Sequence, residues 1–217
     1  MTTLLLIRHG ENDYTRTGKL AGWTPGVRLN ELGQRQAEQL AAKLKTAPIK
    51  ALYCSPLERT RETAAPLAAA LGLAPIVIEG LGEVRYGRWQ GQSLKTLRRQ
   101  KLWRVVQELP SAMQFPEGET VRAVQARAVD AVEAIVRAHP KDTVAAVSHA
   151  DVIKLVVAHY LGVPLDLFQR LQVDTASVTV LRLGHGAPAL GRLNDTAGVE
   201  RPTPPKRRPN GAGRKRG

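Results

Sequence analysis

The stretch Leu4-Leu5-Leu6-Ile7-Arg8-His9-Gly10-Glu11 contains the strongest structural signal in the 217-residue chain. Four consecutive apolar residues that end in polar ones are typical of a central strand of a parallel sheet, which is buried on both faces. Similar runs end at Cys54 and at Ser148. Stretches with helical periodicity separate these runs, and such alternation is typical of α/β proteins. The sequence therefore predicts a three-layer α/β/α sandwich with a mostly parallel sheet.

Helices and further strands can be placed from apolar spacing and from end signals. Between Ala37 and Leu44 the apolar residues follow the i, i+3, i+4, i+7 spacing of an amphipathic helix, and Asn30 can serve as its N-cap. Gly72 and Pro140 are stop signals after two later helical stretches. The other predicted elements are helices at about 57–71, 120–138 and 152–161 and strands at 75–78, 177–183 and 190–194, the last two as a pair at the sheet edge.

Two segments depart from the alternation. Residues 87–118, rich in Trp, Arg and Pro, are predicted to be a lid-like insertion over one end of the sheet, where they would cover a substrate. Residues 200–217 combine Pro, Gly and basic residues and have little to bury, so we expect a disordered basic tail. Residues 1–199, including the insertion, then form one domain.

Nearly half of the net charge of +13 lies in the short tail. Residues 200–217 carry seven Lys or Arg against one Glu, a net of +6, and residues 1–199 carry the other +7. Such a tail can tether a protein to nucleic acid or anionic lipid. A solvated extension with little effect on activity is the simpler interpretation, since termini tolerate change. We therefore expect nucleic acid to bind only weakly, through the tail.

The composition excludes several classes of protein. No run approaches the roughly 18 apolar residues of a membrane span. The residues before Leu4 lack the basic segment of a signal peptide. Cys54 is the single cysteine, so neither an internal disulfide nor a cysteine metal cluster can form. We therefore expect a cytoplasmic protein without a membrane partner.

The residues at the strand ends form one chemical set. In open α/β sheets, ligands bind beyond the carboxyl ends of the strands. The set consists of Arg8 and His9 after the first strand, Arg59 after the second, Glu83 after the third and His149 at the end of the fourth. If these strands are neighbours, two histidines, two arginines and one glutamate meet at one edge of the sheet.

This set matches phosphoryl transfer through histidine. A neutral imidazole is a good nucleophile for phosphorus. Arginine binds two phosphate oxygens at once and keeps its charge, and a carboxylic acid can protonate the leaving oxygen. Because the protein itself supplies the charges, neither a metal nor another cofactor is needed. The sequence therefore predicts a metal-independent enzyme that acts on a small phosphorylated metabolite.

The chain also resembles the histidine phosphatase superfamily, the phosphoglycerate mutase-like proteins, from about residue 4 to residue 195. Five elements occur in the family's order: residues 6–11 followed by 29–37, residues 55–63, Glu83 followed by 86–91, residues 118–120 before a helix with Arg127, and Val147-Ser148-His149. Residues 102–106 and 166–170 are similar to an actinobacterial-type phosphomutase branch of this family.

The resemblance implies a role for each member of the set. His9 would be the phosphorylated nucleophile and Glu83 the proton donor. Arg8, Arg59 and His149 would bind the phosphate. A phosphoglycerate mutase-like fold is implied as well.

Two positions depart from the family pattern. Thr15 stands where the family often has Asn, and its hydroxyl can still donate one hydrogen bond. Ala150 stands where a Gly commonly follows the second histidine, and its backbone N–H can still reach a phosphate from the start of a helix. Both residues are therefore predicted to bind substrate.

The combined prediction is a phosphatase that hydrolyses a small phosphate monoester through a phosphohistidine intermediate. The closest alternative is a phosphomutase, in which basic residues between Arg98 and Arg104 would face the substrate rather than the solvent. A nucleic-acid-binding protein that keeps the fold without turnover is the alternative from another class. Trp23, Trp89 and Trp103 either line the substrate cover or pack beneath the insertion.

Overall fold

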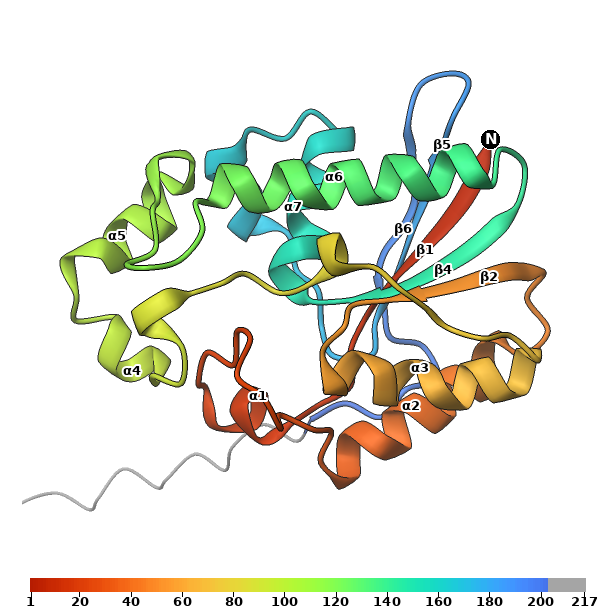
Figure 1. The fold of residues 1–217 in the computed structure, drawn as a ribbon, viewed down its shortest axis with the longest axis horizontal. Coiled ribbons are helices and arrows are strands. Elements are labelled where there is room, and N and C mark those ends of the chain that lie inside the picture. The colour runs from red at the N-terminus through yellow and green to blue at the C-terminus, as the bar shows by residue number, and fades with distance from the viewer. Residues whose placement is uncertain (203–217) are drawn as a thin grey trace, which may run out of the picture.

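A six-stranded sheet forms the centre of the computed structural model, which describes residues 1–202 (Figure 1). Its strands are β1 (Thr2–Arg8), β2 (Ile49–Cys54), β3 (Ile76–Val77), β4 (Thr143–Ser148), β5 (Val178–Leu183) and β6 (Ala189–Asp195). Their order in the sheet is β3-β2-β4-β1-β5-β6. The strands β1 to β4 run parallel, whereas β5 and β6 pair antiparallel at one edge. The mostly parallel sheet and its antiparallel edge pair are as the sequence predicted.

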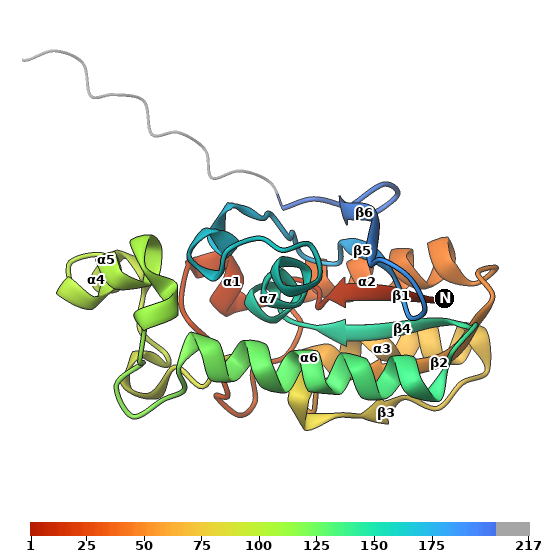
Figure 2. The same cartoon turned by 90° about the horizontal axis from the view of Figure 1, so that it is seen from above.

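Helices cover both faces of the sheet. On one side lie α2 (Glu31–Leu44) and α3 (Glu58–Leu71), and on the other lie α6 (Val121–Ala138) and α7 (Ala150–Tyr160), as Figure 2 shows. Side chains of β1 alternate between the layers: Leu4 and Leu6 belong to the core under α6 and α7, whereas Leu5 and Ile7 belong to the core under α2 and α3. The predicted three layers are therefore confirmed. Within residues 1–202, none of the helices has the length and apolarity needed to cross a bilayer.

The insertion, residues 87–118, extends beyond the carboxyl ends of the parallel strands (Figure 1). It contains α4 (Leu94–Leu97) and α5 (Lys101–Glu108), with 3-10 turns at Gly87–Trp89 and Pro110–Ala112. The short helix α1 (Asp13–Thr17) lies at the same end of the molecule. This end of the sheet is therefore enclosed by segments that contribute nothing to the sheet itself.

The strand β3 and the start of helix α7 show the clearest differences from the predicted bounds. The strand β3 has two residues rather than four, and its Ile76 and Val77 are about half exposed because they pair with β2 alone at the sheet edge. The helix α7 begins at Ala150, two residues earlier than predicted, because the apolar periodicity starts only at Val152. His149 is the extended N-cap residue of this helix. The earlier start brings Ala150 and Asp151 into the first helical turn.

The predicted tail begins at residue 200, and its residues 203–217 lie outside the described part of the chain. Glu200 contacts α2: its carboxylate pairs with Arg35 at 2.9 Å, and its carbonyl oxygen accepts a hydrogen bond from Gln36 at 2.8 Å. Arg201 donates to the hydroxyl of Thr196 at 2.7 Å. The chain thus remains in contact with the domain at the first two residues assigned to the tail.

Candidate active site

The carboxyl ends of β1 and β4 lie side by side because the two strands are direct neighbours in the sheet. Arg8 is in register with Ser148, and the backbone N–H of His9 donates to the carbonyl oxygen of Ser148 at 3.0 Å. The rings of His9 and His149 are therefore close, with 5.2 Å between their centroids. On the other side of β4, Ser55 follows β2 and donates its backbone N–H to Val147 at 3.0 Å. The predicted meeting of strand ends is present.

The backbone after β1 is held against the start of α2 by a close approach that requires glycine. A Cβ atom on Gly33 would lie 2.0 Å from the carbonyl oxygen of Glu11, and one on Gly10 would lie 2.6 Å from the carbonyl oxygen of Gly33. No side chain larger than hydrogen fits at such distances. The two glycines therefore fix the loop that carries His9.

His9 is buried, and its orientation leaves one ring nitrogen for chemistry. The Nδ1 atom lies 2.7 Å from the carbonyl oxygen of Gly10. Because a carbonyl oxygen only accepts hydrogen bonds, Nδ1 carries the proton and Nε2 keeps its lone pair in the neutral ring. Burial, and then the charges of Arg59 and Arg8, hold the pKa of His9 well below its usual value. The imidazole is therefore neutral and nucleophilic near pH 7.

Arg59, in the first turn of α3, is completely buried yet only partly hydrogen-bonded. Its Nη2 atom donates to the carbonyl oxygen of Gly22 at 2.9 Å. Its Nε and Nη1 atoms have no hydrogen-bond partner among residues 1–202. A buried cation with unused donors is costly unless an anion binds to it. The geometry therefore favours an anion between Arg59 and the neighbouring cation.

That neighbouring cation is Arg8, the last residue of β1. Its Nη1 atom donates to the carbonyl oxygen of Val173 at 2.7 Å, and its Nε atom is without a partner in the described part of the chain. Both Arg8 and Arg59 line the same cavity as His9. Two guanidinium groups beside one neutral imidazole make a binding site for a phosphate-like group.

His149 lies behind these residues rather than on the cavity surface, and it is fully buried. Its Nδ1 atom lies 3.3 Å from Nη2 of Arg59, and its Nε2 atom lies 2.8 Å from the hydroxyl of Ser55. A guanidinium only donates, so Nδ1 accepts and Nε2 carries the proton. Burial and the charge of Arg59 lower the pKa of His149 well below its usual value. The phosphate contact that the family resemblance implies for His149 stays a prediction.

Glu83 is the remaining residue of the set, and its carboxyl group lies beside His149. One carboxyl oxygen accepts from the backbone N–H of Val84 at 3.0 Å, and the other lies 3.8 Å from Nδ1 of His149. Burial, and then the negative charge of Asp151, raise the pKa of Glu83 to about 7. A carboxyl with this pKa can both give and take a proton near neutral pH.

The backbone of Glu83 is held by Arg127 of α6, a residue that the sequence analysis noted only as part of a motif. The five N–H donors of Arg127 all have acceptors. Three bonds go to the carbonyl oxygens of Gly80, Gly82 and Glu83, at 2.9, 2.8 and 2.9 Å. The other two go to the carboxylate of Glu119, at 2.7 and 2.9 Å. The loop carrying Glu83 is thus fixed to a long helix of the core.

The two positions that depart from the family pattern, Thr15 and Ala150, both line the cavity. The hydroxyl of Thr15 lies 3.2 Å from the side-chain oxygen of Asn12, which also caps α1. Asn12 was missed in the sequence analysis. Its side chain is buried beside the cavity, and its Nδ2 atom has no partner within residues 1–202. The sequence did contain a signal for Asn12, because this residue lies three positions after His9 and directly before a helix.

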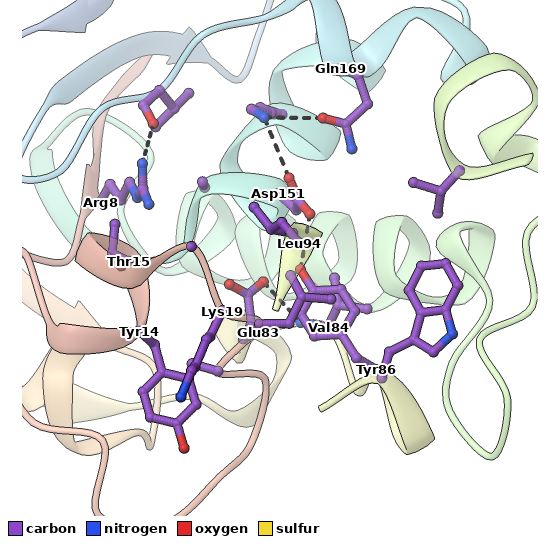
Figure 3. A pocket seen from close by; sticks show the side chains of 18 of the residues that line it. Arg8, Tyr14, Thr15, Lys19, Glu83, Val84, Tyr86, Leu94, Asp151 and Gln169 are labelled. Atoms are coloured by element: carbon purple, nitrogen blue, oxygen red, sulfur yellow. Dashed lines mark hydrogen bonds and ion pairs between the residues drawn. The ribbon is translucent and has the colours of Figure 1, made fainter. Parts of the chain in front are cut away.

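The cavity has a volume of about 330 Å³, and residues of the insertion form part of its lining. Asp151, which follows Ala150, accepts hydrogen bonds from the hydroxyl of Tyr86 at 3.0 Å and from Lys154 at 3.4 Å. Lys154 also donates to Gln169 at 3.2 Å, and Figure 3 shows this connected wall beside Glu83. The sequence analysis did not identify this network. In residues 1–202, no group of three or more His, Cys, Asp or Glu side chains is placed to hold a metal ion.

Comparisons with known proteins agree with this geometry. Residues 4–196 match the histidine phosphatase superfamily (branch 1). The chain is 30% identical to phosphoserine phosphatase 1 of Hydrogenobacter thermophilus, over 90% of this chain and 93% of that protein. It is also 30% identical to the probable phosphoglycerate mutase GpmB of Cronobacter sakazakii, over 82% of this chain and 84% of that one.

A solved structure shows the same fold. YhfR of Bacillus stearothermophilus superposes with a TM-score of 0.85 at 29% identity and covers 92% of this chain and 100% of its own. The family model matches nearly the whole described chain, and two relatives are 30% identical to it. These matches establish the family of the chain. The chain belongs to the histidine phosphatase superfamily.

Proposed function

We propose that this protein is a phosphatase that hydrolyses small phosphate monoesters through a phosphohistidine on His9. The observation that carries the proposal is the pair of guanidinium groups of Arg8 and Arg59, which have nitrogens without a partner among residues 1–202, beside a neutral histidine whose Nε2 atom keeps its lone pair. Such an arrangement suits a dianionic phosphoryl group in line with a nucleophile. Incubation with a panel of phosphate monoesters and measurement of released phosphate tests it.

The reaction proceeds in two steps. In the first, the substrate phosphate lies between Arg8 and Arg59, and Nε2 of His9 attacks phosphorus. A P–N bond forms while the P–O bond to the organic group breaks, and the carboxyl proton of Glu83 passes to the departing oxygen. In the second, Glu83 takes a proton from water as the water oxygen attacks phosphorus, and His9 leaves with its electron pair restored. General acid–base catalysis of this kind contributes about 10²–10⁴-fold.

The remaining residues support the two steps. We propose that His149 holds Arg59 in place through its Nδ1 atom and that it contacts the phosphate when substrate is present. We propose that Thr15, Asn12 and the backbone of Ala150, which line the cavity, donate hydrogen bonds to the phosphate oxygens. Residues 1–199 are proposed to form the catalytic domain, with the insertion covering the organic part of the substrate.

Arg127 is proposed to be a positioning residue for Glu83. Replacement by Lys keeps the charge but leaves one donor group in place of a planar fork, so the three carbonyl oxygens and Glu119 can no longer all be bonded. We expect kcat for an alkyl phosphate to fall about 10- to 100-fold, because small displacements of a catalytic group are costly. The kcat for an aryl phosphate with an acidic leaving group should fall much less, because its departing oxygen needs little protonation.

Arg122→Lys is the matched control, since Arg122 lies on the same helix and, within residues 1–202, its side chain bonds only the carbonyl oxygen of Ser111. This variant should keep the wild-type kcat for both the alkyl and the aryl phosphate. Equal losses on alkyl and aryl phosphates in Arg127→Lys would show that Arg127 has a general structural role and does not act through Glu83.

The fate of the phosphohistidine separates a phosphatase from a mutase. A mutase needs cations in its cover for the second acidic group of a bisphosphorylated intermediate. The basic residues of the insertion are all exposed and contribute nothing to the cavity wall: Arg88, Lys95, Arg98, Arg99, Lys101 and Arg104. Arg104 is instead paired with Glu108 at 2.6 Å. This arrangement supports transfer of the phosphoryl group to water.

With 3-phosphoglycerate and added bisphosphoglycerate, we therefore expect phosphate to be released at the same rate as substrate is consumed. Both products are to be measured, phosphate by colorimetry and 2-phosphoglycerate by a coupled assay. Conversion to 2-phosphoglycerate with little free phosphate would make the protein a mutase and the proposal wrong.

A further inference from the structure

The aromatic residues of the chain are concentrated around the cavity. The sequence contains nine Phe, Trp and Tyr residues. Six of them line the cavity: Tyr14, Tyr86, Trp89, Trp103, Phe115 and Phe168. Aliphatic side chains line the cavity as well, including those of Leu94 and Val106 of the insertion and Leu155 of α7. Beyond the phosphate-binding arginines, the wall is therefore predominantly apolar.

These aromatic rings support one another. The rings of Trp89 and Trp103 are stacked with 6.2 Å between centroids. Phe115 packs edge-on against Trp89 at 5.5 Å and against Tyr86 at 5.1 Å. Trp89 and Phe115 are only 2% and 4% exposed. The wall is thus a packed, preformed surface that an apolar group can cover without reorganising it.

Two charged groups of the wall, Asp151 and Lys154, are already paired with each other. Apart from the two arginines, Lys19 and Lys154 are the cations that line the cavity in the described part of the chain. Lys154 bonds Asp151 and Gln169, and the Lys154–Asp151 pair has no net charge. Lys19 is exposed. A second anionic group on the substrate would therefore find no uncommitted buried cation.

We infer that the site selects phosphate monoesters whose organic part is apolar, and discriminates against those that carry a carboxylate or a second phosphate. The inference rests on the phosphatase function proposed above. Burial of each methylene group against this wall contributes to transition-state binding, because the wall holds the organic part while phosphorus reacts. A cavity of about 330 Å³ is at the lower end of the roughly 300–1,000 Å³ usual for small-molecule sites, so the apolar group is small.

A series of n-alkyl phosphates from ethyl to hexyl tests the inference, because the leaving-group pKa hardly changes along it. We expect kcat/KM to rise about fourfold for each added methylene group until the cavity is filled. The kcat/KM for 2-phenylethyl phosphate should exceed that for ethyl phosphate by about as much as the kcat/KM for hexyl phosphate does. O-Phosphoserine and 3-phosphoglycerate should be the poorest substrates of the panel.

Three variants test whether the cavity wall causes this dependence on chain length. Trp103→Ala removes a wall residue and should flatten the dependence on chain length. Leu102→Ala is the matched control, since Leu102 is exposed, precedes Trp103 on α5 and lies outside the cavity wall, so the dependence should stay as in the wild type. Lys154→Met should leave the preference for hexyl phosphate over O-phosphoserine in place.

A flat alkyl series in the wild type would overturn the inference. So would a preference for O-phosphoserine or 3-phosphoglycerate that disappears in Lys154→Met, because Lys154 would then be a carboxylate-binding residue. Failure of the proposed function itself gives a different result: no phosphate is released from any monoester, including p-nitrophenyl phosphate.

Discussion

Replacing His9 by alanine is expected to abolish turnover while leaving a folded protein. Loss of a covalent nucleophile typically costs about 10⁴-fold or more in kcat. The only other imidazole beside the arginines, among the described residues, is His149, and both of its nitrogens are engaged, by Arg59 and by Ser55. It therefore has no free lone pair with which to replace His9.

Trapping the intermediate gives the decisive measurement. Brief exposure to substrate carrying labelled phosphorus, followed by an alkaline quench, should leave an acid-labile phosphoenzyme in the wild type and none in His9→Ala. His159→Ala is the control, since His159 is exposed on α7, and it should label normally. Label that persists in His9→Ala at wild-type level would place the nucleophile elsewhere.

Replacing Glu83 by glutamine is expected to slow alkyl phosphates about 10²–10⁴-fold and aryl phosphates far less. An alkoxide needs its proton as the P–O bond breaks, whereas an acidic phenol departs readily as an anion. Glu79→Gln serves as the control, because Glu79 belongs to the same segment but is exposed and paired with Arg85. Equal losses on both substrate types in Glu83→Gln would show that Glu83 is not the leaving-group acid.

The pH dependence of the alkyl reaction provides a second measurement. Glu83 must be protonated to act as the acid, and its pKa is raised to about 7. The value of kcat/KM for an alkyl phosphate should therefore fall as the pH rises through about 7. The pKa of His9 lies well below its usual value, so His9 stays neutral over the same range. Glu83→Gln should lack this alkaline decline.

The same raised pKa links stability to pH. In the unfolded chain Glu83 ionises near its ordinary pKa of 4.5, whereas in the folded protein it keeps its proton up to about 7. The unfolded state therefore binds fewer protons over this interval, and the free energy of unfolding should fall as the pH rises from 4.5 to 7. The loss amounts to about 3 kcal/mol by the linkage relation. Thermal unfolding of Glu83→Gln should show a smaller decline over that interval.

Local signals in the sequence were sufficient for most of the fold. Asn30 caps α2 as predicted, with its side-chain oxygen accepting the backbone N–H of Gly33 at 2.9 Å. Gly72 ends α3 in the left-handed conformation that glycine adopts readily. These features depend on residues within one helical turn, so the sequence determines them directly. The extent of β3 was wrong because a strand at a sheet edge depends on pairing with a neighbour rather than on its own residues.

The insertion shows the limit of sequence patterns for this site. Its position over one end of the sheet was predicted, but whether its tryptophans line the cover or pack beneath it was left open. In the structure Trp89 and Trp103 line the cavity and stack on each other, while Trp23 donates from its indole nitrogen to the carbonyl oxygen of Glu83 at 2.6 Å. The directions of the insertion's basic side chains were equally undetermined, because short helices carry little periodicity.

The sequence by itself determined the layers and the residue types at the strand ends, because buried apolar runs and end signals act locally. Whether the strands that carry these residues are neighbours was decided only by the tertiary structure, which places β4 between β1 and β2. Only the tertiary structure decided which nitrogens of Arg59 lack partners, that Arg127 fixes the backbone of Glu83, and that Asp151 and Lys154 neutralise each other in the cavity wall. These contacts join residues from separate elements, and their strength depends on burial and on distances of a few ångströms. No periodicity along the chain encodes such distances, since they arise only when the layers pack together.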